Sequence, residues 1–251
     1  MTVFDSVSPI SVSVHAARLV FAGAVLFDAL DFELAGGRTT CLLGPSGVGK
    51  TSLVRLIAGL EGAGPGEARC SDGLPLRGRF AWMAQQDLLL PWLTVRGNVA
   101  LGARLRGEPA DQGRVEELLA LVGMSGAGGQ RPSELSGGMR QRAALARTLM
   151  EDRPVVLMDE PFSALDAITR HQLQDAAARL LAGRTVLLVT HDPLEALRLG
   201  HRIHVMAGRP ARLDRPLEPS GPPPRDPRDP DLLSLQAELL TRLVKAKESA
   251  R

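Results

Sequence analysis

Lys50 lies in the stretch GPSGVGKTS (44–52), where its charge is suited to binding phosphate. Of the 30 Lys and Arg residues in the chain, only Lys50, Lys245 and Lys247 are lysines. A coding bias toward arginine explains the scarcity of lysine but not the position of Lys50. The stretch fits the pattern G-x-x-x-x-G-K-[ST], in which backbone N–H groups surround phosphate oxygens and a slim ammonium reaches the outer phosphates. The spacing therefore predicts a phosphate-binding loop.

The other residue types in this loop support the same chemistry. Glycines let the backbone approach an anion closely, and the helix expected at 50–60 adds its positive N-terminal end. The hydroxyl of Thr51 is a candidate ligand for Mg²⁺. The residues predicted to contact nucleotide here are Gly44, Pro45, Ser46, Gly47, Val48, Gly49, Lys50, Thr51 and Ser52.

Two acidic residues follow an apolar run in VVLMDEP (155–161). Asp159 is expected at the carboxyl end of a buried strand, where it could hold Mg²⁺ directly or through water. The neighbouring Glu160 could accept a proton from a water that attacks a γ-phosphate. Taken alone, an apolar run before two acidic residues is weak evidence for a hydrolytic site. It becomes strong evidence in a chain that also has a phosphate-binding loop upstream.

A second glycine step occurs in LSGGMRQR (135–142), where Ser136, Gly137 and Gly138 open an expected helix. The exposed N–H groups, the hydroxyl and the helix dipole could bind another anion. Ser136 would also serve as an ordinary N-cap. Without further context the cap is the better explanation.

The elements that must position these residues alternate along the chain. Continuous apolar runs predict buried parallel strands, alternating runs predict half-exposed strands, and longer periodic segments predict helices. Strands are expected at 10–15, 30–34, 38–44, 79–84, 154–159, 184–190 and 201–206, and helices at 50–60, 94–106, 111–122, 136–150, 167–182 and 232–247. This order predicts an α/β protein with a phosphate-binding sheet and an inserted helical lobe.

Composition narrows the class of protein. A length of 251 residues suits one or two domains, and a net charge of +2 gives no argument for binding nucleic acid or an anionic membrane. Cys41 and Cys70 lack metal-type spacing and suit a reducing cytoplasm. The N-terminus has no signal-peptide pattern, and no apolar run reaches about 18 residues, so no membrane span is expected.

Taken in this order, the phosphate-binding loop, LSGGMRQR, VVLMDEPFSALD (155–166) and Thr190-His191 resemble the ATP-binding subunit of an ABC transporter. The resemblance covers about residues 10–206 and implies a P-loop NTPase (RecA-like) core with a mostly parallel sheet. It also implies ATP and Mg²⁺ as cofactors, and a homodimer that closes around two ATP molecules. The expected domains are the ATPase domain at 1–206 with its helical subdomain at about 88–150, a Pro-rich linker at 207–231 and a C-terminal helix at 232–251.

The resemblance also assigns roles to single residues. Gln85 matches the glutamine that contacts Mg²⁺ and the attacking water, and His191 matches the histidine that contacts the γ-phosphate. Asp166 ends the loop that passes between the two subunits and is an expected nucleotide contact, and Ser136 to Gly138 bind the nucleotide of the opposite chain. An aromatic side chain usually stacks on adenine, and Phe21 is the best-placed candidate, with Phe27 as the alternative.

The segment LLLPWLTVRGNV (88–99) and the Pro-rich tail resemble the nitrate, sulfonate and taurine importer branch, which includes importers of thiamine-precursor pyrimidines. This implies a peripheral subunit on the cytoplasmic face of the inner (plasma) membrane, with a transmembrane permease and, indirectly, a periplasmic solute-binding protein as partners. A thiamine-precursor pyrimidine is expected first as solute and a sulfonate second. Trp92 either packs the helical lobe onto the core or lines the groove for the membrane subunit.

Other kinds of ABC ATPase are the alternatives to an importer subunit. A soluble ABC ATPase of repair or translation would carry tandem ATPase halves or a long coiled-coil insertion, and neither occurs between Lys50 and Ser136. An ATPase of iron–sulfur assembly is disfavoured by the segment 88–92 and the tail. An exporter subunit remains open.

Overall fold

The computed structural model describes residues 9–21, 23–61 and 67–249, which divide into two compact units. The first unit contains the described residues of Met1–Phe80, Pro154–Asp159 and Leu181–Arg251. The second contains Ala81–Arg153 and Glu160–Leu180. The domain bounds expected from the sequence stay a prediction.

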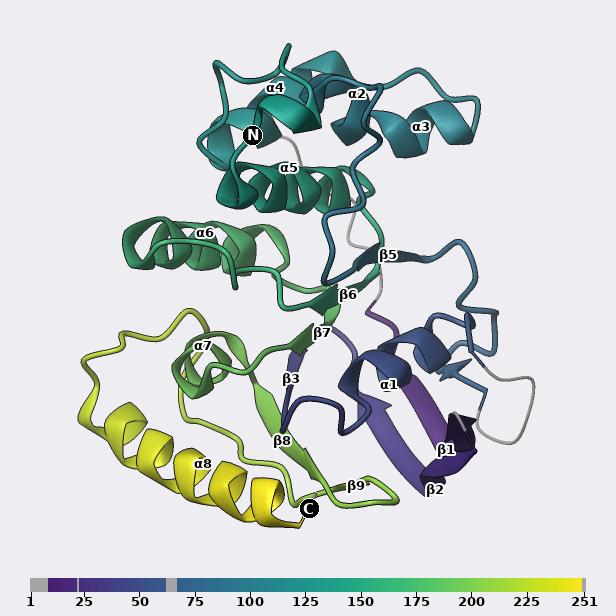
Figure 1. Cartoon of the computed structure of the whole chain (residues 1–251), viewed down its shortest axis with the longest axis vertical. Helices are drawn as coiled ribbons and strands as arrows, with labels where there is room; N and C mark the ends of the chain where they lie inside the picture. The colour runs from purple at the N-terminus through teal and green to yellow at the C-terminus, as the bar shows by residue number, and fades with distance from the viewer. Residues whose placement is uncertain (1–8, 22, 62–66, 250–251) are drawn as a thin grey trace. The chain divides into compact units, whose positions relative to one another are not determined.

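A parallel sheet forms the core of the first unit (Figure 1). Its strands are β3 (Thr39–Leu43), β6 (Val155–Asp159), β7 (Thr185–Val189) and β8 (Arg202–Ala207), in the order β6-β7-β3-β8. The short β9 (Arg212–Leu213) pairs antiparallel with β8 at the edge. Every residue of β6 and β7 is buried, as their continuous apolar sequences predict. The mostly parallel α/β architecture is therefore confirmed.

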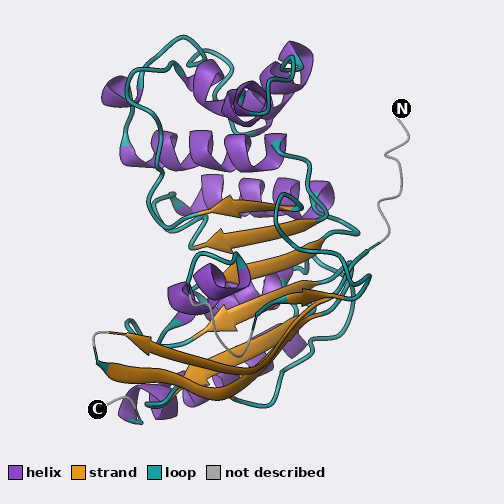
Figure 2. Cartoon of the chain, turned by 90° about the vertical axis from the view of Figure 1, so that its right-hand side faces the viewer, coloured by secondary structure: helices purple, strands orange, loops and turns teal. Residues whose placement is uncertain are grey.

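A long antiparallel hairpin belongs to the same unit (Figure 2). It consists of β1 (Val12–Phe21) and β2 (Ala24–Leu34), and β4 (Arg69–Cys70) pairs with β1. Both strands of the hairpin extend well beyond the segments 10–15 and 30–34 expected from alternation. Helices α1 (Lys50–Ile57) and α7 (Pro193–Leu199) also belong to the first unit. Strand β5 (Phe80–Met83) begins at the last residue of a segment of the first unit and continues into the second.

The second unit is helical and contains α2 (Val95–Val99), α3 (Leu101–Leu105), α4 (Gln112–Leu121), a 3₁₀ turn (Pro132–Glu134), α5 (Gly137–Met150) and α6 (Ala167–Leu180). The single helix expected at 94–106 is two helices that break at Ala100. Gly97 and Gly102 lie on either side of this break, and glycine weakens a helix by about 1 kcal/mol relative to alanine.

The Pro-rich segment after β9 is fixed to the first unit by Arg225, which is 6% exposed. Its guanidinium donates to the carbonyls of Leu197 and Gly200 at the end of α7, both at 2.8 Å. It also donates to the carbonyls of Pro219, Ser220 and Gly221. Helix α8 (Pro230–Glu248) follows this anchor. In the described part of the chain, no helix combines the length and apolarity needed to cross a membrane.

Candidate functional site

The loop between β3 and α1 encloses the ammonium of Lys50. Its Nζ donates to the carbonyl oxygens of Gly44 at 2.8 Å and Pro45 at 2.9 Å. Helix α1 begins at Lys50 after Gly49, whose φ is 113° and which supplies no side-chain cap. The first N–H groups of α1 therefore meet no capping side chain and are suited to receive an anion.

Close packing explains why two loop positions are glycine. A Cβ atom on Gly44 would lie 2.5 Å from the carbonyl oxygen of Met206, and the φ of Gly44 is 150°. A Cβ atom on Gly49 would lie 3.0 Å from the ring of Phe27. Any side chain at either position would displace the loop from its support.

The two candidate aromatic residues have different surroundings. Phe27 is fully buried, with its ring beneath the phosphate-binding loop at Gly49. Phe21 lies at the end of β1 and is 64% exposed. Only an exposed ring face can stack on a base, so the burial of Phe27 favours Phe21. The adenine contact itself stays a prediction.

Thr51 and Asp159 meet although they come from α1 and β6. The hydroxyl of Thr51 donates to Oδ2 of Asp159 at 2.7 Å. Mg²⁺ prefers oxygen ligands, usually one or two from protein together with waters and substrate phosphates. This hydroxyl and carboxylate fit such an ion. No group of three or more His, Cys, Asp or Glu side chains that could hold a metal occurs in the described residues.

The register of the parallel strands places His191 at the same edge of the sheet. Asp159 pairs with Val189, and Leu42 of β3 also pairs with Val189. Carboxyl ends of parallel strands meet at one edge, so the phosphate-binding loop, Asp159 and the segment that carries His191 leave the sheet together. The strand register thus brings the phosphate-binding loop, Asp159 and the segment that carries His191 to the same edge of the sheet.

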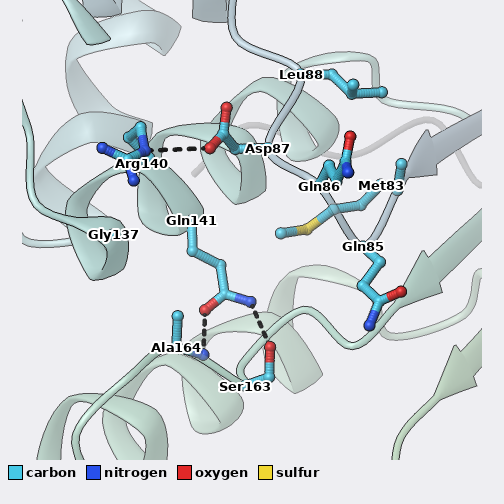
Figure 3. A pocket seen from close by; sticks show the side chains of 11 residues that line it. Met83, Gln85, Gln86, Asp87, Leu88, Gly137, Arg140, Gln141, Ser163 and Ala164 are labelled. Carbon is cyan, nitrogen blue, oxygen red and sulfur yellow. Dashed lines mark hydrogen bonds and ion pairs between the residues drawn. The ribbon is translucent and has the colours of Figure 1, made fainter. Parts of the chain in front are cut away.

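The remaining predicted residues belong to the second unit, where a cavity of about 470 Å³ is lined by Gln85 and Gly137 among others (Figure 3). Gln85 comes two residues after β5, and Gly137 is the first residue of α5. The side chains of Gln141 and Ser163 face the same cavity.

Ser136 is the N-cap of α5, as expected of a serine that precedes a helix. Its Oγ accepts a hydrogen bond from the N–H of Met139 at 3.3 Å. Accepting this bond leaves the hydroxyl proton of Ser136 to donate elsewhere, so capping and anion binding are compatible. Gly138 is closely packed as well, because a Cβ atom there would lie 3.1 Å from the carbonyl of Ala164.

Asp166 has a local structural role at the start of α6. Its Oδ1 accepts from the N–H of Thr169 at 3.0 Å, and this hydrogen bond lowers the pKa of the carboxyl. The carboxylate is thus ionised and oriented by the helix start. A contact with nucleotide stays a prediction.

Glu160 has a left-handed backbone with a φ of 52°. Such a conformation costs a non-glycine residue about 1–3 kcal/mol and is kept only where neighbours hold it. The carbonyl oxygen of Glu160 accepts from Nε2 of Gln141 at 2.8 Å and from Oγ of Ser163 at 3.1 Å. These bonds fix the residue that is expected to accept the proton.

Gln141 is a residue that the sequence patterns do not single out and that holds the backbone of Glu160 in place. Besides its bond to Glu160, its Oε1 accepts from the N–H of Ala164 at 2.7 Å, and the side chain is buried. The available signal was its place inside LSGGMRQR, as a glutamine on a helix whose following turns are rich in alanine.

Comparison with known proteins gives a consistent result. The family described as "ABC transporter" matches residues 27–163. The chain is 44% identical to an "uncharacterized ABC transporter ATP-binding protein" of Haemophilus influenzae, over 92% of this chain and 98% of that protein. It is 42% identical to the "aliphatic sulfonates import ATP-binding protein SsuB 1" of Pseudomonas syringae pv. syringae, over 93% of this chain and 96% of that protein.

Solved structures agree with the sequence matches. The chain is similar to the ATP-binding cassette MJ0796, which was solved as a dimer in a post-hydrolysis state bound to ADP and Pi. The TM-score is 0.73 at 27% identity, over 84% of this chain and 99% of that one.

Proposed function

Because this chain belongs to the ABC transporter family and is an ATPase of that family, we propose that it drives uptake of a small solute through a separate membrane subunit. The hydrogen bond between Thr51 and Asp159, beside the loop that encloses Lys50, carries the chemical part of the proposal. It supports a phosphate-binding role for Lys50 and a Mg²⁺-binding role for Thr51 and Asp159 at this edge of the sheet.

The proposed hydrolysis depends on position and charge. Lys50 and the N–H groups of its loop stabilise negative charge on the transferred phosphoryl group. Thr51 and Asp159 would hold Mg²⁺, which supplies further neutralisation of the phosphates. Glu160 accepts the proton of the attacking water, while Gln85 and His191 orient that water and the γ-phosphate.

A second copy of the chain completes each site in this proposal. Ser136, Gly137 and Gly138 of one chain contact the nucleotide held by Lys50 of the other. Two anion-binding helix starts in one chain, at α1 and α5, suit such a reciprocal dimer. The dimeric state of a structurally similar cassette supports it.

The permease contact is proposed at the turn that carries Leu88 and Trp92. Trp92 is 68% exposed and Leu88 is also exposed, whereas Leu89 is buried. The turn therefore packs through Leu89 and leaves two large apolar side chains for a partner. The guanidinium of Arg147 holds the turn by donating to the carbonyls of Asp87 and Leu88 at 2.6 and 2.7 Å.

The solute is proposed to be an aliphatic sulfonate. Several relatives of 38–42% identity are named aliphatic sulfonates import ATP-binding proteins. This support places a sulfonate ahead of the thiamine-precursor pyrimidine that the sequence analysis expected first. A periplasmic binding protein and a place at the cytoplasmic face of the inner membrane complete the proposal.

Reconstitution tests it. The chain is combined in lipid vesicles with a candidate membrane subunit and a candidate solute-binding protein. Phosphate release and uptake of radiolabelled ethanesulfonate or hydroxymethylpyrimidine are then measured. Both should rise with ethanesulfonate and fall to background with Glu160→Gln. Stimulation by the pyrimidine alone would replace the solute, and hydrolysis indifferent to the membrane subunit would contradict coupling to transport.

A further inference from the structure

Helix α8 carries an apolar stripe on its exposed face. The stripe consists of Leu233, Ala237, Leu240 and Val244, and its large members are 53%, 49% and 59% exposed. The spacing of four, three and four residues is that of a coiled-coil seam. Helix α8 packs through a different face, which buries Leu232, Leu239 and Ala246. The stripe is therefore available to another molecule.

The stripe is complementary to itself when one helix is reversed. Its midpoint lies between residues 238 and 239, so an antiparallel copy places Leu233 opposite Val244 and Ala237 opposite Leu240. Each small side chain then faces a large one, as close packing requires. A parallel copy would place Ala237 opposite Ala237 and leave a gap at that layer.

Charges at the two ends of α8 favour the same arrangement. Asp229 and Asp231 lie at its N-terminal end beside Arg228, and Lys245 and Lys247 lie at its C-terminal end beside Glu248, so the two ends carry opposite net charges. Antiparallel helices bring these opposite charges together and oppose their dipoles favourably, whereas parallel helices bring like charges together.

The residues that flank the stripe place no charge in the seam. Ser234, Gln236 and Thr241 are uncharged. Arg242 is directed elsewhere, because its guanidinium donates to Asp214 at 2.9 Å and to the carbonyl of Arg215 at 2.8 Å. A second α8 can therefore cover the stripe without burying an unpaired ion.

We propose that α8 pairs antiparallel with α8 of a second copy of this chain. The pairing rests on the proposed ATP-dependent dimer, because a seam of about three turns is far smaller than the roughly 800 Å² per partner of a stable interface. The pairing requires that this dimer place the two tails close together, and a two-fold axis would make each contact reciprocal. The tail thus adds a second region of contact to the dimer.

Disulfide cross-linking tests the register. Leu233→Cys and Val244→Cys are prepared separately in the Glu160→Gln chain, and oxidised with ATP either alone or mixed. The native Cys41 and Cys70 are buried and serve as an internal background. A linked dimer should form in the mixture and not in either single variant, because identical positions lie about 16 Å apart along antiparallel axes at 1.5 Å per residue. A mixture of Val244→Cys with Leu74→Cys, an exposed leucine outside α8, should stay unlinked.

Further outcomes distinguish failure of the α8 pairing from failure of the ATP-dependent dimer. Adding Leu240→Glu should abolish the link while size-exclusion chromatography still shows the ATP-dependent dimer. A dimer that shows no link in the mixture, or that links in a single variant, would overturn antiparallel pairing alone. Absence of both dimer and link would overturn the ATP-dependent dimer as well. Sedimentation of the chain with vesicles of anionic phospholipid, lost in Leu240→Glu, would assign the stripe to a membrane instead of a second copy.

Discussion

The hydroxyl of Thr51 lies 2.7 Å from the carboxylate of Asp159, so a hydrogen bond joins the start of α1 to the end of β6. The bond links the residue after Lys50 to the residue before Glu160. One hydrogen bond therefore connects the segment proposed to bind phosphate with the segment that carries the proposed proton acceptor. A displacement of the phosphate-binding loop would also disturb the end of β6.

Replacement of Lys50 by Arg should abolish hydrolysis although the charge is kept. The ammonium fits between the carbonyls of Gly44 and Pro45, where a planar guanidinium is too broad. Loss of one such electrostatic contact lowers kcat by about 100-fold or more. Phosphate release at saturating Mg-ATP measures this, with Arg104→Lys on α3 as the matched control. Turnover near that of the control would contradict the assignment of Lys50.

Phe21→Ala should raise the KM for ATP and leave kcat nearly unchanged, because an exposed ring contributes to binding alone. Phe27→Ala should instead lower the free energy of unfolding by about 3–5 kcal/mol, since it removes a fully buried ring. Steady-state kinetics and urea unfolding distinguish the two variants. A stable Phe27→Ala protein with a raised KM would assign the stacking residue to Phe27.

Glu160→Gln should bind ATP, stop hydrolysis and accumulate as a dimer, because the amide keeps the shape but accepts no proton. Adding Ser136→Arg should separate the subunits while Lys50 still binds nucleotide. Ser136→Ala in the same background controls for loss of the helix cap, which destabilises by about 1 kcal/mol. Size-exclusion chromatography with and without ATP reads the result. A dimer that persists with Ser136→Arg would place Ser136 outside the interface.

Trp92→Ala should weaken transport or assembly with the membrane subunit far more than hydrolysis by the isolated chain. The reason is that Trp92 is largely exposed and Leu89, three residues earlier, is the one that packs. Phosphate release is compared for the isolated chain and the reconstituted complex. Equal losses in the two would favour a packing role for Trp92.

Arg225→Lys should lower the free energy of unfolding by about 1–3 kcal/mol or more, because lysine has three donors for five carbonyls, three of them in buried hydrogen bonds, and a single unsatisfied buried acceptor costs about 1–3 kcal/mol. Thermal unfolding measures the loss. Arg228→Ala is the control, since Arg228 is exposed and pairs with Asp226, and it should leave the midpoint unchanged. Equal midpoints for the two variants would show that the anchor contributes nothing.

The positions of the parallel strands along the chain, and the glycine-rich loop before α1, could be predicted because both rest on local patterns of apolar and glycine residues. The sequence does not predict α7, since a helix of seven residues is too short to show clear periodicity. It also treats the segment around Arg225 as an extended linker, because the carbonyls that hold this arginine come from α7 and from a turn. The choice between Phe21 and Phe27 likewise needs burial, which depends on the tertiary structure.

Gln141 connects the start of α5 to the backbone of Glu160 through a single buried amide. In a dimer of the proposed kind, Ser136 at the start of α5 contacts the nucleotide of the opposite chain. A tilt of α5 caused by that contact would then shift Glu160 in its own chain, which faces the other nucleotide. Each active site would thereby respond to the occupancy of the other, and hydrolysis would rise with ATP concentration more steeply than for two independent sites.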